Sequence, residues 1–374
     1  MRRTWYRRLL PPLLTIGLTA CDLAGRRGPV VGFAYTGASQ PYVELAQGMF
    51  RGVVATPPRI LYDTATPDET SEGALAFAAT LIGRSDVAVV VGPSNSRHAL
   101  ATAPAYNAAG LPEIIPSATN RRLRAMGPYT FTLVPDDSVE GDFLARFAAR
   151  HLGARRAVLF YVNDEYGEGL RVGIVSTFAR EGGTITESIP LGSGTDIPTL
   201  VSAALGRQHA DVVFCAGRAT ETALVLKAVR STAPGVPVVA GDGAYFLPAL
   251  TASAGPDLSG LYVLSFWVYD STDPAHRAFA ALVRQVLHAE PKPEDALTMD
   301  ALLLAASARA EAGPDRQAVR RWLAGLGRER PPFHGLTGEI TFGPERTLPL
   351  TMVRFRSGGV ERVVDSLVGA GSAP

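Results

Sequence analysis

The sequence predicts an α/β fold of two lobes, each built around a largely parallel β-sheet. Short apolar runs rich in valine, isoleucine and leucine alternate with longer helical stretches, which is the pattern of parallel strands joined by helical crossovers. This alternation restarts after Pro135, so two successive α/β blocks are visible. With 374 residues, of which 47% are hydrophobic, the chain is long enough to form two domains with substantial cores.

The amino terminus is predicted to be a lipoprotein signal peptide, residues 1–20, and not part of the fold. Arginines and no acidic residue precede an apolar run, residues 9–18, that is too short to span a bilayer. The small residues before Cys21 resemble the lipobox of bacterial lipoproteins, in which the cysteine is lipidated and becomes the mature amino terminus. An ordinary secretory signal with a chance cysteine is the alternative. Residues 21–28 then form a short polar tether.

The first block supplies five predicted strands and three predicted helices. Each strand is a short apolar run, and glycines or prolines stand just past the helices, where helices commonly end. The predicted strands are residues 29–35, 59–62, 87–91, 112–116 and 129–134, and the predicted helices are residues 42–54, 72–82 and 97–109.

The second block has the same alternation. Its predicted strands are residues 157–162, 184–190, 211–215, 236–241 and 261–267, and its predicted helices are residues 138–151, 170–181, 197–205 and 220–231. Three more helices follow at residues 275–289, 297–312 and 315–325, and the tail has two predicted strands, residues 338–342 and 350–355.

The late helices have few strands among them, whereas the first block is short of helices to cover its sheet. We therefore expect the chain to cross between lobes three times, near Pro135, Phe266 and Leu336. Lobe 1 would comprise residues 29–135 and 267–335, and lobe 2 residues 136–266 and 336–374.

The segment from Val87 to Asn120 carries the clearest functional signal. A strand is followed by Ser94, Asn95 and Ser96, any of which can cap the next helix, and the following strand ends in a second polar turn, residues 117–120. In open α/β sheets, ligands bind at the carboxyl ends of the strands. Hydroxyls, backbone N–H groups and a helix amino terminus suit a small anion such as a carboxylate.

Five motifs resemble those of type I periplasmic binding proteins, in particular the leucine/isoleucine/valine-binding receptors of ABC transporters. They are VVGPSNS at 90–96, GLPEIIPSATN at 110–120, VNDEYGEG at 162–169, DVVFCAG at 211–217 and GDGAYF at 241–246. The resemblance implies a periplasmic binding protein-like I fold of two Rossmann-like lobes, with a ligand clamped between them by hinge closure. It also implies an extracytoplasmic, monomeric solute-binding protein in the cell envelope, without cofactor, that is lipid-anchored at Cys21 and delivers an amino acid or related carboxylate to an ABC permease.

The resemblance assigns the polar ligand contacts residue by residue. Ser96 binds the α-carboxylate, and Ser117, Ala118 and Thr119 add backbone and hydroxyl contacts. Asp242, in the second lobe, receives the α-amino group. A zwitterion needs donors at one end and an acceptor at the other, so this assignment is chemically consistent. The plainer roles are helix cap for Ser96 and turn formers for the others.

The remaining assignments concern the pocket for the ligand side chain. The resemblance places Tyr42 and Tyr166 there, although either tyrosine could simply cover core. Arg218 replaces the aromatic residue usual in leucine-type receptors. If Arg218 faces the cleft, it hints at a ligand with an additional acidic group; otherwise it is a solvated arginine at a helix start. Asn95 replaces the cysteine of the family's first-lobe disulfide, and we expect no internal disulfide.

Other function classes find little support in the sequence. Outside residues 1–20 there are 32 basic and 35 acidic residues with no basic block, so nucleic-acid binding is not expected. The six histidines lack metal-ligand spacing, and the glycines at 167, 169 and 173 do not match the dinucleotide fingerprint. We expect neither an enzyme nor a metal site. The open alternative is a ligand-sensing or protein-interaction lipoprotein on the same fold, not coupled to transport.

Overall fold

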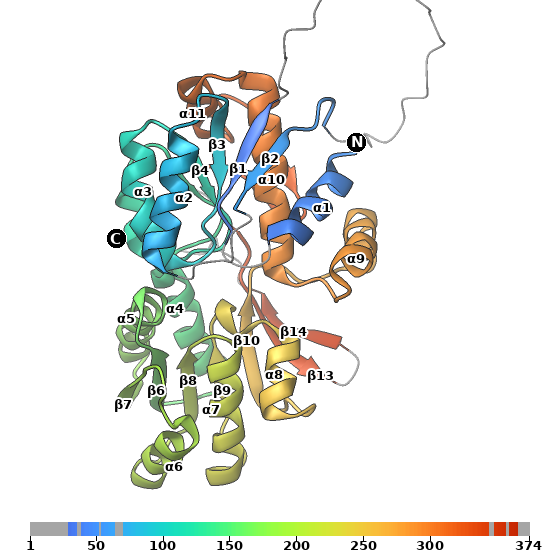
Figure 1. Cartoon of the computed structure of the whole chain (residues 1–374). Coiled ribbons are helices and arrows are strands. Elements are labelled where there is room, and N and C mark those ends of the chain that lie inside the picture. Colours follow the sequence, from blue (N-terminus) through green and yellow to red (C-terminus); the bar gives the residue numbers. More distant parts are fainter. Residues whose placement is uncertain are drawn as a thin grey trace, which may run out of the picture.

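The computed structural model describes residues 29–35, 39–51, 54–63, 70–343, 348–356 and 359–365. Figure 1 shows two lobes stacked end to end, with helices on the outside of each. The expected signal peptide and Cys21 lie outside the described residues. Within them, no helix has both the length and the apolar character needed to cross a membrane.

Lobe 1 contains a five-stranded sheet made of β1 (Val30–Phe33), β2 (Arg59–Tyr62), β3 (Val87–Val91), β4 (Glu113–Ile115) and β5 (Thr130–Thr132). All strands are parallel, in the order β2-β1-β3-β4-β5. Its helices are α1 (Ser39–Phe50), α2 (Ser71–Ile82), α3 (Ser96–Ala108), α9 (Pro274–Leu287), α10 (Pro293–Ala312) and α11 (Arg316–Ala324). Every residue of β3 is buried because α2 and α3 lie on one side of the sheet and α1 and α10 on the other (Figure 1).

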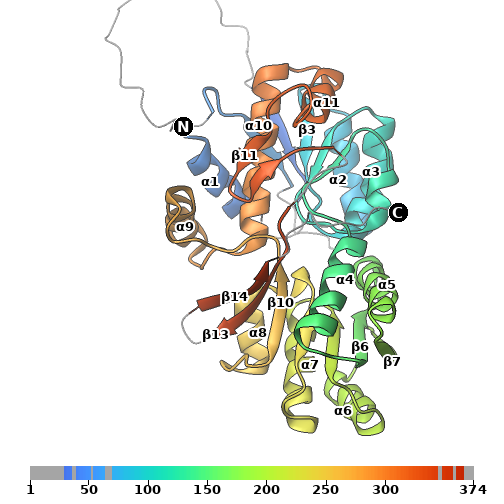
Figure 2. The ribbon, with the colours of Figure 1, turned by 180° about the vertical axis from the view of Figure 1, so that it is seen from behind.

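Lobe 2 contains a seven-stranded sheet made of β6 (Arg156–Val162), β7 (Thr184–Leu191), β8 (Val212–Ala216), β9 (Val238–Ala240), β10 (Leu261–Ser265), β13 (Thr351–Arg356) and β14 (Gly359–Asp365). The order in the sheet is β14-β13-β10-β9-β8-β6-β7. The five strands β10, β9, β8, β6 and β7 are parallel to one another. The strands β13 and β14 add an antiparallel edge, which Figure 2 shows from behind. Its helices are α4 (Asp137–Arg146), α5 (Glu165–Arg180), α6 (Ile197–Arg207), α7 (Ala219–Thr232) and α8 (Leu247–Ala254). The predicted α/β fold of two lobes with parallel sheets is confirmed.

The chain passes between the lobes from β5 to α4, from β10 to α9, and again before β13. The ribbon of β11 (Phe333–Gly335) and β12 (Gly338–Ile340) stays with lobe 1, because Asp300 of α10 accepts hydrogen bonds from the backbone N–H groups of Leu336 and Thr337. The ring of Phe342 also lies edge-on to that of Phe131, with centroids 4.9 Å apart. We therefore place the third crossover after Phe342, later in the chain than the expected position near Leu336.

The helices α5 and α10 begin four or more residues earlier than the sequence pattern indicated. The helix expected from residue 170 begins at Glu165, because Asp164 caps it by accepting hydrogen bonds from the backbone N–H groups of Tyr166 and Gly167. The helix expected from residue 297 begins at Pro293, where the missing N–H of proline costs nothing. Helix α8 and the strands β11 and β14 were not predicted.

Glycines allow α4 and α5 to pack in close contact. A Cβ atom at Gly141 would lie 2.7 Å from the backbone of Gly173, and one at Gly173 would lie 2.7 Å from the carbonyl oxygen of Asp137. This close approach gives Gly173 of α5 a structural role in helix packing.

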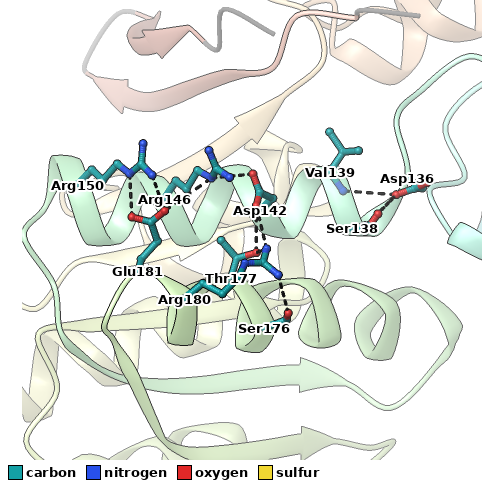
Figure 3. A network of polar contacts seen from close by, with 10 residues as sticks. All are labelled: Asp136, Ser138, Val139, Asp142, Arg146, Arg150, Ser176, Thr177, Arg180 and Glu181. Carbon is teal, nitrogen blue, oxygen red and sulfur yellow. Dashed lines mark hydrogen bonds and ion pairs between the residues drawn. The ribbon is translucent and has the colours of Figure 1, made fainter. Parts of the chain in front are cut away.

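Ion pairs tie the exposed edges of the same two helices together (Figure 3). Arg150, in the helical turn after α4, donates a hydrogen bond to each carboxylate oxygen of Glu181. Nη2 of Arg180 in α5 lies 3.3 Å from Asp142 Oδ1. Exposed pairs of this kind contribute little stability individually, so the close glycine contacts dominate the packing of the two helices.

Candidate functional site

A cavity of about 400 Å³ lies between the lobes at the carboxyl ends of the strands. Seven of the eight predicted ligand contacts line it, and Tyr42 does not. The seven are Ser96, Ser117, Ala118, Thr119, Tyr166, Arg218 and Asp242.

Lobe 1 supplies hydroxyl groups to the cavity wall. Asn95 caps α3 by accepting a hydrogen bond from the backbone N–H of His98 at 2.9 Å, which leaves Ser96 as the first helical residue. The side chains of Ser96 and Thr119 are each only 2% exposed, and neither hydroxyl has a hydrogen-bond partner among the described residues. An unpaired buried hydroxyl costs about 1–3 kcal/mol, so these two groups favour an occupant that hydrogen-bonds to them.

A serine contact joins the two polar loops of lobe 1. The hydroxyl of Ser117, which follows β4, donates to the carbonyl oxygen of Ser94, which follows β3, at 3.0 Å. The two loops therefore form one continuous wall beside the amino terminus of α3, where unpaired N–H groups favour an anion.

Lobe 2 supplies a carboxylate. Asp242 follows β9, and the hydroxyl of Tyr166 donates to its Oδ1 at 2.9 Å and accepts from the backbone N–H of Gly243 at 3.1 Å. Burial raises the pKa of Asp242 to about 6, although the hydrogen bond from Tyr166 opposes the shift. Asp242 is thus mostly ionised at neutral pH and is oriented by Tyr166.

Two further acids, Asp137 and Glu140 at the start of α4, lie near Asp242, and neither was predicted to belong to the site. Glu140 is fully buried, and its Oε1 accepts from the backbone N–H of Asp242 at 2.8 Å. Burial, and then the negative charge of Asp242, raise the pKa of Glu140 well above its ordinary value. Burial also raises the pKa of Asp137 to about 7. Burial of these neighbouring carboxyl groups therefore disfavours negative charge on all of them at once.

Arg218 lines the cavity, but its guanidinium is already paired with Asp164, so its position does not require an additional acidic group on the ligand. Its guanidinium Nη2 donates to Asp164 Oδ2 at 2.7 Å, and its Cζ lies 5.5 Å from the ring centroid of Tyr166. Burial acts to lower the pKa of Arg218, but Asp164 outweighs it and the pKa is raised. Arg97 of lobe 1 approaches the same carboxylate at 3.8 Å and Glu165 at 3.3 Å, so this end of the cleft is bridged by ion pairs between the lobes.

Tyr42 lies outside the cavity because α1 begins at Ser39, three residues earlier than expected. Its side chain is buried, and its hydroxyl donates to Asp295 Oδ1 at 2.7 Å. Its ring lies 4.7 Å from the ring of Tyr35, centroid to centroid. Tyr42 therefore supports the start of α10 from behind.

One charged wall of the cavity was not predicted from the sequence. Lys292 and Glu294, at the start of α10, line the cavity, and Lys292 Nζ lies 2.6 Å from Glu294 Oε2. Burial acts to lower the pKa of Lys292, but Glu294 and Asp295 outweigh it and the pKa is raised. The chain has only two lysines, and Lys292 stands directly before a proline that starts a helix. This position was the only feature of the sequence that could have pointed to Lys292 as a site residue. The other wall residues that were not predicted include Tyr245, Phe246, Ala249, Leu264, Phe266 and Leu297.

The described part of the chain contains no cluster of three or more histidine, cysteine, aspartate or glutamate side chains able to hold a metal ion. The cavity is lined by hydroxyl groups, carboxylates, two cationic side chains and aromatic rings. Such a lining suits the binding of a small polar molecule.

Comparisons with known proteins show which protein family has this architecture. The family model described as "Periplasmic binding protein" matches residues 34–356. The Leu/Ile/Val-binding protein homolog 1 of Brucella suis biovar 1 (strain 1330) is 25% identical over 287 residues, which is 75% of this chain and 73% of that protein.

Solved structures share the fold. The branched-chain amino acid transporter substrate binding protein LivJ from Streptococcus pneumoniae, in complex with isoleucine, superposes with a TM-score of 0.79 at 22% identity, over 89% of this chain and 99% of that one. A solute binding protein of an ABC transporter from R. palustris, in complex with benzoate, gives a TM-score of 0.77 at 17% identity, over 90% and 96% of the two chains. The resemblance drawn from the motifs is thereby confirmed, and the chain belongs to the periplasmic binding protein family.

Proposed function

We propose that the protein is an extracytoplasmic solute-binding lipoprotein of an ABC transporter, and that it holds an amino acid or a related small carboxylate between its lobes. One observation carries this proposal. The hydroxyls of Ser96 and Thr119 on lobe 1, which have no hydrogen-bond partner within the described part of the chain, share a cavity with the carboxylate of Asp242 on lobe 2. A relative named for Leu/Ile/Val binding supports the same ligand class.

The two lobes would hold opposite ends of one zwitterion. The α-carboxylate accepts hydrogen bonds from Ser96, Thr119 and the amino terminus of α3, and the α-ammonium donates to Asp242. Each charge-assisted hydrogen bond contributes roughly 1.5–3 kcal/mol, so a handful accounts for micromolar affinity, about −8 kcal/mol. Because the ligand contacts both lobes only when they are close together, it stabilises the closed state.

The cellular setting of the proposal follows from the amino terminus. Cys21 would carry the lipid that holds the protein at the periplasmic or extracytoplasmic face of a membrane, as a monomer within reach of an ABC permease.

A thermal-shift screen of the purified protein against amino acids, short amides and small organic acids tests the proposal. A ligand present at about 1,000 times its Kd stabilises the folded protein by about 4 kcal/mol, which gives a clear rise in Tm. Deleting the gene should then abolish uptake of that ligand by the cell. Absence of any stabilising compound would count against solute binding. Unchanged uptake despite binding would instead favour the sensing or protein-interaction role.

Ligand affinity should fall with decreasing pH as Asp242 takes up a proton. The α-ammonium favours ionised Asp242, whose pKa in the free protein is raised to about 6 by burial. Above this pKa the carboxylate is ready to bind, and below it the ligand must displace a proton. Calorimetric titration should therefore show an affinity about tenfold weaker at pH 5 than at pH 8. The same affinity at both pH values would mean that Asp242 does not hold the ammonium group.

A further inference from the structure

The pair of Lys292 and Glu294 forms a rigid polar wall of the cavity. The side chains are 24% and 35% exposed, and Nζ of Lys292 lies 2.6 Å from Glu294 Oε2. The other carboxylate oxygen of Glu294, Oε1, accepts from the hydroxyl of Tyr35 at 3.0 Å. The pair is thus held from behind by lobe 1 while it remains accessible to the cavity.

The neighbouring groups fix the lysine end of the pair as well. Nζ of Lys292 lies 3.9 Å from Asp295 Oδ1, and Asp295 is itself held by Tyr42 and by the backbone N–H of Lys292. From lobe 2, the ring of Phe246 lies 5.3 Å from the same Nζ, measured to the ring centroid. A ligand side chain in this part of the cavity therefore meets an ammonium donor and a carboxylate acceptor next to one another.

The charges that line the cavity balance. Arg218 and Lys292 are cationic, and Asp242 and Glu294 are anionic. A zwitterion adds no net charge. A second anionic group on the ligand would approach Glu294 and Asp295, and a second cationic group would approach Lys292 and Arg218.

An apolar ligand side chain fits this wall no better. It would remove water from Lys292 and Glu294 on closure without replacing the hydrogen bonds that the water had made, and buried charges without full hydrogen bonding are unfavourable. The group that satisfies both is neutral and carries an acceptor and a donor on one carbon atom. Its carbonyl oxygen accepts from Lys292 Nζ, and its N–H donates to Glu294 Oε2.

We propose that Lys292 and Glu294 select an amino acid whose side chain ends in a neutral carboxamide or ureido group. This inference rests on the proposed function, because it takes the zwitterionic end of the ligand to lie against Ser96 and Asp242. It concerns only the distal end of the ligand, so the two proposals can fail separately.

Calorimetric titration with compounds of matched shape tests the selection. Leucine, asparagine and aspartate differ little in shape, as do glutamine and glutamate, and citrulline supplies the ureido group. At least one amide or ureido compound should bind at least about tenfold more tightly than leucine and than its carboxylate counterpart. Leucine or an acidic amino acid binding as tightly or more tightly would overturn the selection and leave the proposed function standing. Failure of every amino acid to bind would overturn both.

Variants make the test specific to the pair. Lys292→Met combined with Glu294→Leu should shift the preference towards leucine by at least about tenfold, and Glu294→Gln, a milder change of almost the same shape, should reduce the preference for the amide in the same direction. Lys227→Met, at the other lysine, which is exposed on α7, is the matched control and should leave the preference unchanged. Preferences that stay the same in both cavity variants would overturn the assignment.

Because the chain has two lysines, ¹³C-methylation of lysine side chains gives an independent NMR measurement. The bound amide should shift the methyl signal of Lys292, assigned by its loss in Lys292→Arg, and leave that of Lys227 in place. Ligand binding without any shift of the Lys292 signal would contradict the direct contact.

Discussion

Replacing Asp242 with asparagine should weaken binding of the amino acid by at least about 30-fold, which corresponds to about 2 kcal/mol. The substitution preserves the shape of the side chain but removes the negative charge that receives the ligand ammonium. It also leaves that ammonium enclosed in the closed cleft without a counter-charge, next to Tyr166. Titration calorimetry at pH 7.5, where Asp242 is ionised in the native protein, measures the effect.

The matched control for this prediction is Asp257→Asn. Asp257 lies in lobe 2 outside the cavity, with 72% of its side chain exposed. Its Oδ1 accepts from the backbone N–H of Ser259 at 2.9 Å and from the Ser259 hydroxyl at 2.6 Å, and lies 3.6 Å from Arg230 Nη2. Its replacement should leave the affinity unchanged. If Asp242→Asn bound the ligand as tightly as this control, the assignment of the ammonium to Asp242 would be wrong.

Replacing Asp300 with alanine should lower the free energy of unfolding by about 3 kcal/mol. The carboxylate of Asp300 is fully buried, and it accepts from the backbone N–H of Leu336 at 2.7 Å and of Thr337 at 2.8 Å, and from the Thr337 hydroxyl at 2.7 Å. Burial raises the pKa of Asp300 to about 6, with the Thr337 hydrogen bonds opposing, so it accepts these bonds as a carboxylate at pH 7.5. Alanine would leave the buried backbone N–H groups of Leu336 and Thr337, in the turn between β11 and β12, without their acceptor.

Urea unfolding followed by circular dichroism measures this loss. Thr337→Val removes only the hydroxyl donor and should cost about 1 kcal/mol, which separates the side-chain contribution from that of the backbone. An Asp300→Ala protein within about 0.5 kcal/mol of the native protein would show that this carboxylate does not anchor the ribbon of β11 and β12 to α10.

The fold could be predicted because its signals are local. The five valine and alanine residues of β3 form a run that only a strand buried on both faces explains, and the same holds for β8. The polar residues around Ser96 and Thr119 were found for the same reason, since each directly follows a strand. The turns at the carboxyl ends of neighbouring parallel strands must meet at one edge of the sheet.

The parts of the site that the sequence did not predict depend on contacts between distant segments. Glu140 resembles an ordinary acidic residue in the first turn of a helix, and only packing of α4 against lobe 2 places it behind Asp242. Lys292 and Glu294 reach the cavity because the chain returns from lobe 2 to lobe 1 after β10, and α10 then covers the sheet of lobe 1. Tyr42 was placed in the pocket by the resemblance, but it lies within α1, which begins at Ser39, and its hydroxyl donates to Asp295 instead.

The central claim is that the cleft holds both ends of one zwitterion, with the carboxylate on lobe 1 and the ammonium on lobe 2. Titration calorimetry of the identified amino acid against its α-carboxamide and its deamino analogue tests this claim most directly. We predict that each analogue binds at least about tenfold more weakly, that Ser96→Ala removes most of the penalty for the α-carboxamide, and that Asp242→Asn removes most of the penalty for the deamino analogue. Equal affinity for the amino acid and either analogue in the native protein would contradict the claim.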